Sequence, residues 1–197
     1  MKIESENIHR IFSALDQQIL IMGGAPISLV VCGGTALAAL GLITRTTKDV
    51  DVLAGIEKTD SGLNILPMDK FPSWLSAAAQ VVARDFTLPT DWLNLGPAPQ
   101  VKSGLPEGLA ERLVGKSFGN FLTIYFISKR DQIFFKLYAA VDRDDYHLQD
   151  LKALNPSNEE IEASARWVLT QDVSEEFRMM LKDFLIRNGY ENIAPGI

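Results

Sequence analysis

Two aspartates separated by one residue are the clearest candidates for metal chemistry in this chain. Asp49 and Asp51 lie in KDVDVLA at 48–54, where polar and apolar residues alternate as in a half-buried strand. Residues i and i+2 of a strand share one face, about 6–7 Å apart along it. Two carboxylates on one face repel each other unless a cation lies between them, and Mg²⁺ accepts such a pair together with waters and substrate phosphates. The alternative is a strand with two solvent-facing acids.

A glycine pair precedes these acids. Gly33, Gly34 and Thr35 follow the continuous apolar run ISLVVC at 27–32, which predicts a buried strand, and open a short apolar helix expected at 35–41. Glycine allows close backbone approach to a ligand, and the first N–H groups of a helix attract anions. Thr35 is expected to cap the helix or to donate its hydroxyl to a phosphate. The alternative is ordinary turn chemistry. Together and in this order, the two motifs predict a phosphate-and-metal site.

The remaining elements predict an α+β fold, with a small mixed sheet flanked by helices and a helical bundle at the C-terminus. The expected strands are 27–32, 48–54 and 121–128, and the expected helices are 8–22, 35–41, 74–86, 129–145, 146–154, 158–170 and 173–188. The stretches 55–68 and 87–106 are expected to be irregular. A soft boundary near residue 130 divides an α/β core, 1–130, from a helical region, 131–197, that is expected to pack on it.

Composition narrows the class of protein. The 197 residues are 47% hydrophobic and 22% charged, with a net charge of −6, which predicts a folded chain and disfavours a general nucleic-acid binder. Cys32 is the single cysteine, so no internal disulfide can form. The charged start of the chain and its short apolar runs predict a cytoplasmic protein with no membrane segment.

The combined motifs resemble a known family. G-G-T at 33–35, R-T-T at 45–47 and D-V-D at 49–51 are similar to the nucleotidyltransferase fold of the DNA polymerase beta superfamily. More narrowly, the chain resembles bacterial stand-alone nucleotidyltransferases related to AbiE-type toxins, in which a helix lysine and a downstream aspartate follow. F-F-K-L-Y-A-A at 134–140 and R-D-D-Y-H-L-Q-D-L at 143–151 match that pattern, which gives Lys136 and Asp150.

The resemblance implies transfer of a nucleoside monophosphate from an NTP to a hydroxyl of an RNA or protein acceptor. It implies that the Gly-Gly-Thr turn holds phosphates and that Asp49 and Asp51 bind Mg²⁺ or Mn²⁺. It also implies that Lys136 neutralises phosphate charge and that Asp150 contacts the metal or orients the acceptor. An antitoxin-like protein is an implied partner. Arg45 either reaches a phosphate or balances the two acids.

The chain departs from the wider superfamily in one respect. Many members carry a third carboxylate on a later strand, but the expected strand FLTIYFIS at 121–128 has no acid. A module that binds a nucleotide or a protein partner without catalysis is therefore the alternative function. G-K-S at 115–117 does not make a P-loop, because that motif needs a glycine at position 110, which is Ala110.

Structural roles compete with the functional ones at several positions. Lys136 is expected to be solvated unless the family role applies, and Asp150 is expected to pair with Arg143 or Lys152 on the surface. Trp92 is more often a core residue than a base-stacking one. The apolar residues of the last two helices either form an oligomer interface or pack on the chain's own sheet: Trp167, Val168, Phe177, Met180, Leu181, Phe184 and Leu185.

Overall fold

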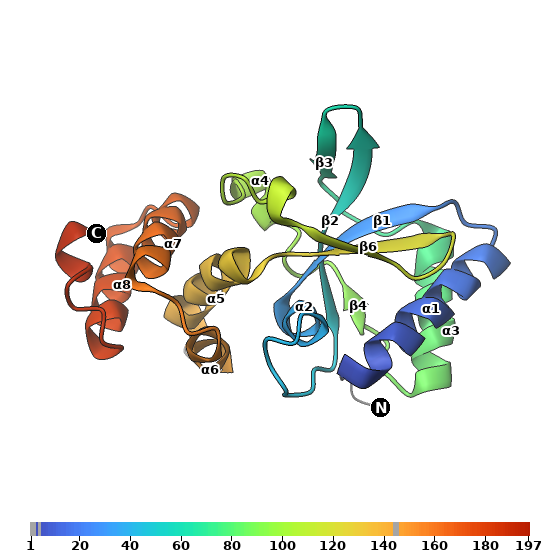
Figure 1. Cartoon of the computed structure of the whole chain (residues 1–197), viewed down its shortest axis with the longest axis horizontal. Coiled ribbons are helices and arrows are strands. Elements are labelled where there is room, and N and C mark those ends of the chain that lie inside the picture. Colours follow the sequence, from blue (N-terminus) through green and yellow to red (C-terminus); the bar gives the residue numbers. More distant parts are fainter. Residues whose placement is uncertain (1–2, 4, 144–145) are drawn as a thin grey trace. The chain divides into compact units, whose positions relative to one another are not determined.

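The computed structural model describes residue 3 and residues 5–143 and 146–197. Residues 144–145, which belong to the expected helix 129–145 and to the motif at 143–151, lie outside the described residues. The chain divides into two compact units (Figure 1), the first formed by Met1–Lys102 with Glu107–Ser128 and the second by Ser103–Pro106 with Lys129–Ile197.

A mixed sheet forms the centre of the first unit. Its strands run in the order β3-β2-β1-β6-β5, and β4 pairs with β2. β1 is antiparallel to β2 and parallel to β6, while β4 is parallel to β2. The strands are β1 (Ile27–Cys32), β2 (Val50–Thr59), β3 (Gly62–Leu66), β4 (Leu93–Asn94), β5 (Val114–Ser117) and β6 (Leu122–Phe126). This mixed sheet with flanking helices confirms the predicted α+β fold class.

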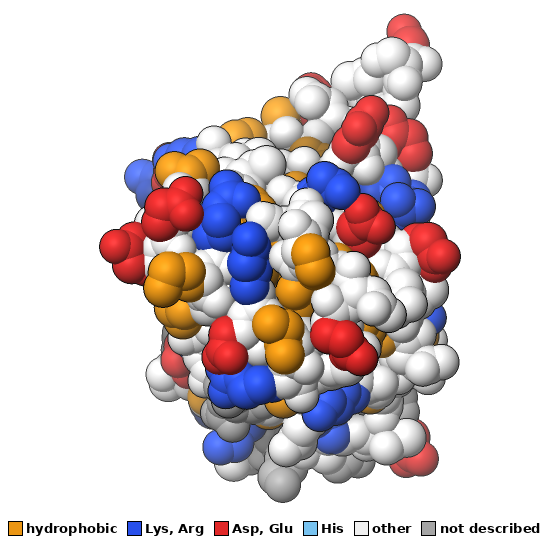
Figure 2. Space-filling view, turned by 90° about the vertical axis from the view of Figure 1, so that its left-hand side faces the viewer, with side chains coloured by type: hydrophobic (Ala, Val, Ile, Leu, Met, Phe, Trp, Pro, Cys, Tyr) orange, Lys and Arg blue, Asp and Glu red, His pale blue; other side chains and the backbone are white. Residues whose placement is uncertain are grey.

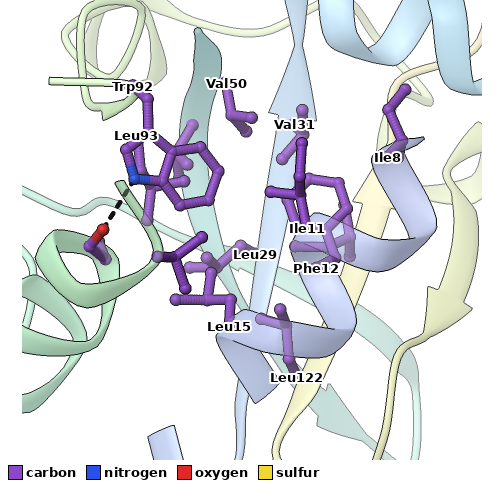
Figure 3. Packing of buried hydrophobic residues seen from close by; sticks show 14 of the residues in the cluster. Ile8, Ile11, Phe12, Leu15, Leu29, Val31, Val50, Trp92, Leu93 and Leu122 are labelled. Atoms are coloured by element: carbon purple, nitrogen blue, oxygen red, sulfur yellow. Dashed lines mark hydrogen bonds between the residues drawn. The ribbon is translucent and has the colours of Figure 1, made fainter. Parts of the chain in front are cut away.

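Two helices cover one face of this sheet. α1 (Ser5–Ile21) and α3 (Ser73–Phe86) pack side by side over it (Figure 1), and the hydrophobic cluster between them and the strands is shown in Figure 3. Leu29 and Val31 of β1 and Val50 and Val52 of β2 belong to that cluster. Because strand side chains alternate between faces, Cys32 and Asp51 lie on the opposite face.

The shorter helices of this unit differ from the predictions in detail. α2 (Gly33–Ala39) begins at the glycine pair, two residues earlier than expected, and Gly41 follows its end with φ +69°. The other helical turns are α4 (Gln100–Ser103) and the 3-10 helix η1 (Ala110–Arg112). The α1 helix ends at Ile21, so Met22 lies beyond the helix to which the hydrophobic spacing assigned it.

The prediction of a loop at 55–68 is wrong. β2 continues to Thr59 and turns back into β3, and the Thr59 hydroxyl donates to the carbonyl oxygen of Gly62 at 3.0 Å across the turn. The stretch 87–106, also expected to be irregular, contains β4 and α4. The expected strand 48–54 begins only at Val50, so Asp49 immediately precedes β2.

The second unit is helical. The helices are α5 (Lys129–Arg143), α6 (Tyr146–Ala153), α7 (Asn158–Gln171), α8 (Glu175–Arg187) and the 3-10 helix η2 (Ala194–Gly196). α7 begins with a capping box: the Ser157 hydroxyl accepts from the backbone N–H of Glu160 at 3.2 Å, and the Glu160 carboxylate accepts from the backbone N–H of Ser157 at 2.9 Å. These helices match the predicted C-terminal helical bundle.

Aromatic rings hold α7 and α8 against α5. The Trp167 ring lies 5.7 Å from that of Phe134 and 5.4 Å from that of Phe135, and the Phe177 ring lies 5.6 Å from that of Tyr138. Burial raises the pKa of Tyr138, and the nearby Asp172 and Asp142 raise it further, against a lowering by Arg143. Apolar residues of the last two helices therefore pack on α5, a helix of their own unit.

Little of that apolar set remains for an oligomer interface. Six of the seven residues are buried, and only Met180 is exposed, at 46%. Figure 2 shows the face carrying α7 and α8, where exposed hydrophobic side chains are separated by charged ones. Among the described residues, no helix is both long and apolar enough to span a bilayer.

Candidate functional site

The glycine turn and the second acid are in direct contact. Gly33 adopts φ +68°, a left-handed conformation that residues other than glycine rarely take. A Cβ atom at this position would collide with the carboxylate of Asp51. Cys32, just before the turn, pairs in register with Asp51, and its thiol lies 3.6 Å from the Asp51 carbonyl oxygen. Position 33 therefore requires glycine for two independent reasons.

The first acid is tied to the start of α2. The Thr35 hydroxyl donates to the carbonyl oxygen of Asp49 at 2.6 Å, and the Thr47 hydroxyl donates to the Asp49 carboxylate at 3.0 Å. Thr35 is fully buried, and α2 has no side-chain N-cap. The expected capping role of Thr35 is therefore wrong, and its hydroxyl instead fixes the backbone that presents Asp49.

Burial alternates across the acids. Asp49 is exposed, Val50 is buried, Asp51 is half-buried and Val52 is buried, an alternation that agrees with two acids on one face. Directly beyond them, β2 carries one extra residue, because Val31 pairs with Val52 while Val30 pairs with Ala54. Such a bulge bends a strand locally, and bulges are common beside functional sites.

Arg45 and Thr47 lie against the second glycine of the turn. A Cβ atom on Gly34 would lie 3.1 Å from the Thr47 hydroxyl oxygen and 3.4 Å from the Nη2 atom of Arg45. The guanidinium also donates to the carbonyl oxygen of Thr46, at 3.4 Å. A positive charge therefore stands beside the backbone of the glycine turn. This position is compatible with both predicted roles of Arg45, contact with a phosphate and balance of the two acids.

The pattern-based interpretation missed Asn94. Its amide nitrogen lies 3.3 Å from the Asp51 carboxylate and 3.5 Å from the Val50 carbonyl oxygen. β4, which carries it, pairs with β2 so that Leu93 faces Val50 and Asn94 faces Asp51. The only sequence signal was its position after Trp92 in a proline-rich stretch. Trp92 itself is fully buried and donates to the carbonyl oxygen of Ala79 at 2.9 Å (Figure 3), which confirms its core role.

Lys136 and Asp150 form a buried ion pair within the second unit. The Lys136 ammonium lies 2.8 Å from an Asp150 carboxylate oxygen, and the two residues are only 4% and 2% exposed. The ammonium also stands 5.7 Å from the centre of the Tyr146 ring, a favourable cation–π distance. The expectations of a solvated lysine and of a surface pair between Asp150 and Arg143 or Lys152 are both wrong.

The donor set of the first unit fits a hydrated divalent ion. The described residues contain no group of three or more histidine, cysteine, aspartate or glutamate side chains that could hold a metal. A carboxylate pair with neutral hydrogen-bond donors behind it suits Mg²⁺, which keeps several waters and binds substrate phosphates. Asp49 and Asp51 would hold such an ion together with a ligand. G-K-S at 115–117 lies in β5, a strand without a phosphate-binding turn, in agreement with rejection of a P-loop.

A comparison with known protein families assigns the chain to one of them. A family model described as "nucleotidyltransferase of unknown function (DUF6036)" matches residues 6–158, well over half of the 197 residues. The chain belongs to this family. The DUF6036 match includes the glycine turn, both acids, Asn94, Lys136 and Asp150, whereas almost all of α7 and the whole of α8 follow it. No curated protein and no solved structure matches the chain significantly.

Proposed function

We propose that this protein transfers a nucleoside monophosphate from an NTP to a hydroxyl of an RNA or protein acceptor, with Mg²⁺ or Mn²⁺ at Asp49 and Asp51. The observation that carries the proposal is the contact between the Asp51 carboxylate and Gly33. A triphosphate that lies on the glycine turn reaches the same point as an ion held by the acids. Membership of a nucleotidyltransferase family supports the reaction class.

The proposed roles follow from the position of each group. Backbone N–H groups of Gly33, Gly34 and Thr35 bind phosphate oxygens, and the Arg45 guanidinium adds positive charge beside Gly34. Asp49 and Asp51 hold the metal. When bound, a divalent ion withdraws electron density from the α-phosphate and stabilises the leaving pyrophosphate. The acceptor oxygen bonds to the α-phosphorus, and the bond from that phosphorus to the oxygen that bridges to the β-phosphate breaks. Pyrophosphate leaves with that oxygen, and the hydroxyl proton passes to solvent.

Lys136 and Asp150 complete the proposal on the strength of the family resemblance. The resemblance assigns phosphate charge to Lys136 and the metal or the acceptor to Asp150, whereas within the second unit Asp150 holds the Lys136 ammonium. Their 2.8 Å contact supports a shared role, because each charge fixes the position of the other. The narrower relationship to AbiE-type toxins, with an antitoxin-like protein partner, belongs to the same proposal.

The direct test uses NTPs labelled at the α-phosphate. Purified protein is incubated with each NTP, Mg²⁺ and a cell extract, and RNA and protein fractions are examined for label. We expect transfer by the wild type that is lost in the Asp49→Ala/Asp51→Ala variant and when EDTA is added. Equal labelling by wild type and variant would falsify the proposal.

A second candidate is a nucleotide- or protein-binding module without catalysis. It is favoured by the donor set, in which no third acid joins Asp49 and Asp51 among the described residues. Calorimetry with NTP and Mg²⁺ that shows binding, combined with no labelling of any fraction, would support this candidate. Robust transfer would dismiss it.

A further inference from the structure

Asn94 holds the Asp51 carboxylate from outside the sequence motifs. The two residues are 43 positions apart, and they meet because β4 adds to β2 as a parallel strand in which Asn94 pairs with Asp51. The partner residues Leu93 and Val50 both belong to the hydrophobic cluster beneath α1 and α3. By the alternation of strand side chains, Asn94 and Asp51 therefore project together from the opposite face.

The described contacts of Asn94 fix the orientation of its amide. The Oδ1 atom accepts from the backbone N–H of Gly96 at 2.8 Å, while the Nδ2 atom faces the Val50 carbonyl oxygen and the Asp51 carboxylate. Exchange of the two amide atoms would put an oxygen against two oxygens and a nitrogen against an N–H group. The network therefore selects one orientation, in which Asn94 donates to Asp51.

We infer that Asn94 is a positioning residue for the divalent ion: its amide holds the Asp51 carboxylate against the Gly33 turn. A neutral donor restrains a carboxylate and adds no charge of its own to the site. Residues that hydrogen-bond to metal ligands in this way typically contribute about 10–100-fold to metal affinity. This inference rests on the proposed function, because it assumes an ion at Asp51.

A substitution at Gly96 tests the position of the Asn94 amide independently. A Cβ atom at Gly96 would lie 3.0 Å from Asn94 Oδ1, tighter than ordinary van der Waals contact. Gly96→Ala therefore displaces the Asn94 amide while the amide itself remains. Leu93→Ala serves as the control for loss of β4. It weakens the packing of β4 on the core but removes no group that touches Asp51.

The test is a titration of the full chain with Mn²⁺ in the absence of nucleotide, in which free Mn²⁺ is followed by electron paramagnetic resonance and Tm is measured on each sample. We expect Asp51→Asn to remove the site and Asn94→Ala to weaken binding about 10-fold or more. Gly96→Ala should lie between Asn94→Ala and wild type. Leu93→Ala should lower Tm yet bind Mn²⁺ within about twofold of wild type, and Asn64→Ala, on β3, should change neither property.

Two results would overturn the inference, and they separate it from the proposed function. If Asp51→Asn removes the Mn²⁺ site but Asn94→Ala binds within about twofold of wild type, the positioning role falls and the metal site stands. The same conclusion follows if Leu93→Ala weakens binding as much as Asn94→Ala, because a loss of β4 would then explain both. If wild type and Asp51→Asn bind Mn²⁺ equally, the metal part of the proposed function fails together with the inference.

Discussion

Asp51 and Asp150 are aspartates in the same chain with opposite environments. Asp51 is half-buried in the first unit, where it lies against Gly33 and accepts a hydrogen bond from the neutral amide of Asn94. Asp150 is buried in the second unit, where it meets the ammonium of Lys136 at 2.8 Å. The Asn94 amide restrains Asp51 without adding a charge of its own, whereas the Lys136 ammonium brings an opposite charge to Asp150. The first arrangement suits an acid that receives a cation, and the second suits an acid that holds a lysine.

The largest expected effect concerns the buried pair. Lys136→Met or Asp150→Leu alone leaves one charge buried without its partner, which should lower the free energy of unfolding by about 3–5 kcal/mol. The double variant removes both charges and should recover most of that loss. Urea unfolding of the four proteins measures the coupling. If the two single losses simply add in the double variant, the residues do not act as a pair.

The next largest effect is expected at Gly33, which lies against Asp51 in the first unit. Gly33→Ala forces a Cβ atom into the Asp51 carboxylate, and displacement of a reacting group by about 1 Å costs about 100-fold in rate. Gly41→Ala is the matched control, because Gly41 has φ +69° and nothing within 4 Å of an added Cβ atom. Both variants should lose stability through backbone strain, but only Gly33→Ala should lose nucleotidyl transfer. Equal loss of transfer would assign the effect to strain and not to the acid.

Gln132 is another buried polar residue on α5, near Lys136 of the ion pair in sequence. It lies four residues before Lys136 on α5 and is fully buried, yet neither amide atom has a hydrogen-bond partner among the described residues. An unsatisfied buried polar group costs about 1–3 kcal/mol, so Gln132→Leu should raise the free energy of unfolding by about that amount. Gln17→Leu, on an exposed position of α1, should change it by less than about 0.5 kcal/mol. A destabilised Gln132→Leu protein would show that the amide makes a stabilising interaction.

The smallest effect concerns a third kind of acid, the half-buried Asp172 in the short turn between α7 and α8. The Ser174 hydroxyl donates to the Asp172 carboxylate at 2.7 Å and the Ser174 backbone N–H donates to it at 2.9 Å, which lowers the pKa of Asp172. A lowered pKa in the folded state stabilises the protein above the pKa of the unfolded chain, and that stabilisation disappears as pH falls through the folded pKa. Urea midpoints between about pH 6 and pH 3 should therefore fall more steeply in wild type than in Asp172→Asn. Parallel pH profiles would show that the hydrogen bonds from Ser174 to Asp172 contribute nothing measurable to stability.

The local parts of the site were predictable from the sequence. The ISLVVC strand, the Gly-Gly turn and the acids after it are close along the chain, and hydrophobic spacing and glycine chemistry set their geometry. The predicted strand β1 was found at Ile27–Cys32, and the predicted approach of the turn to the acids was found at Gly33 and Asp51. The family match supports the general class that these motifs indicated.

Features that depend on distant pairing were not predictable. Asn94 reaches Asp51 only because a two-residue strand in a proline-rich stretch adds to β2, and no local pattern marks that event. The burial of Lys136 depends on Asp150 of another helix, whereas a lone lysine at the edge of an apolar face is normally solvated. The β2–β3 hairpin was missed because the polar residues at its turn led to the prediction that the whole stretch 55–68 is a loop.

The most direct measurement is a crystal structure of the protein soaked with an NTP and Mn²⁺. We expect an anomalous Mn²⁺ peak between the carboxylates of Asp49 and Asp51, with the phosphates of the nucleotide on the backbone of residues 33–35. A nucleotide bound elsewhere in the molecule, or bound with no Mn²⁺ at these two aspartates, would contradict this prediction.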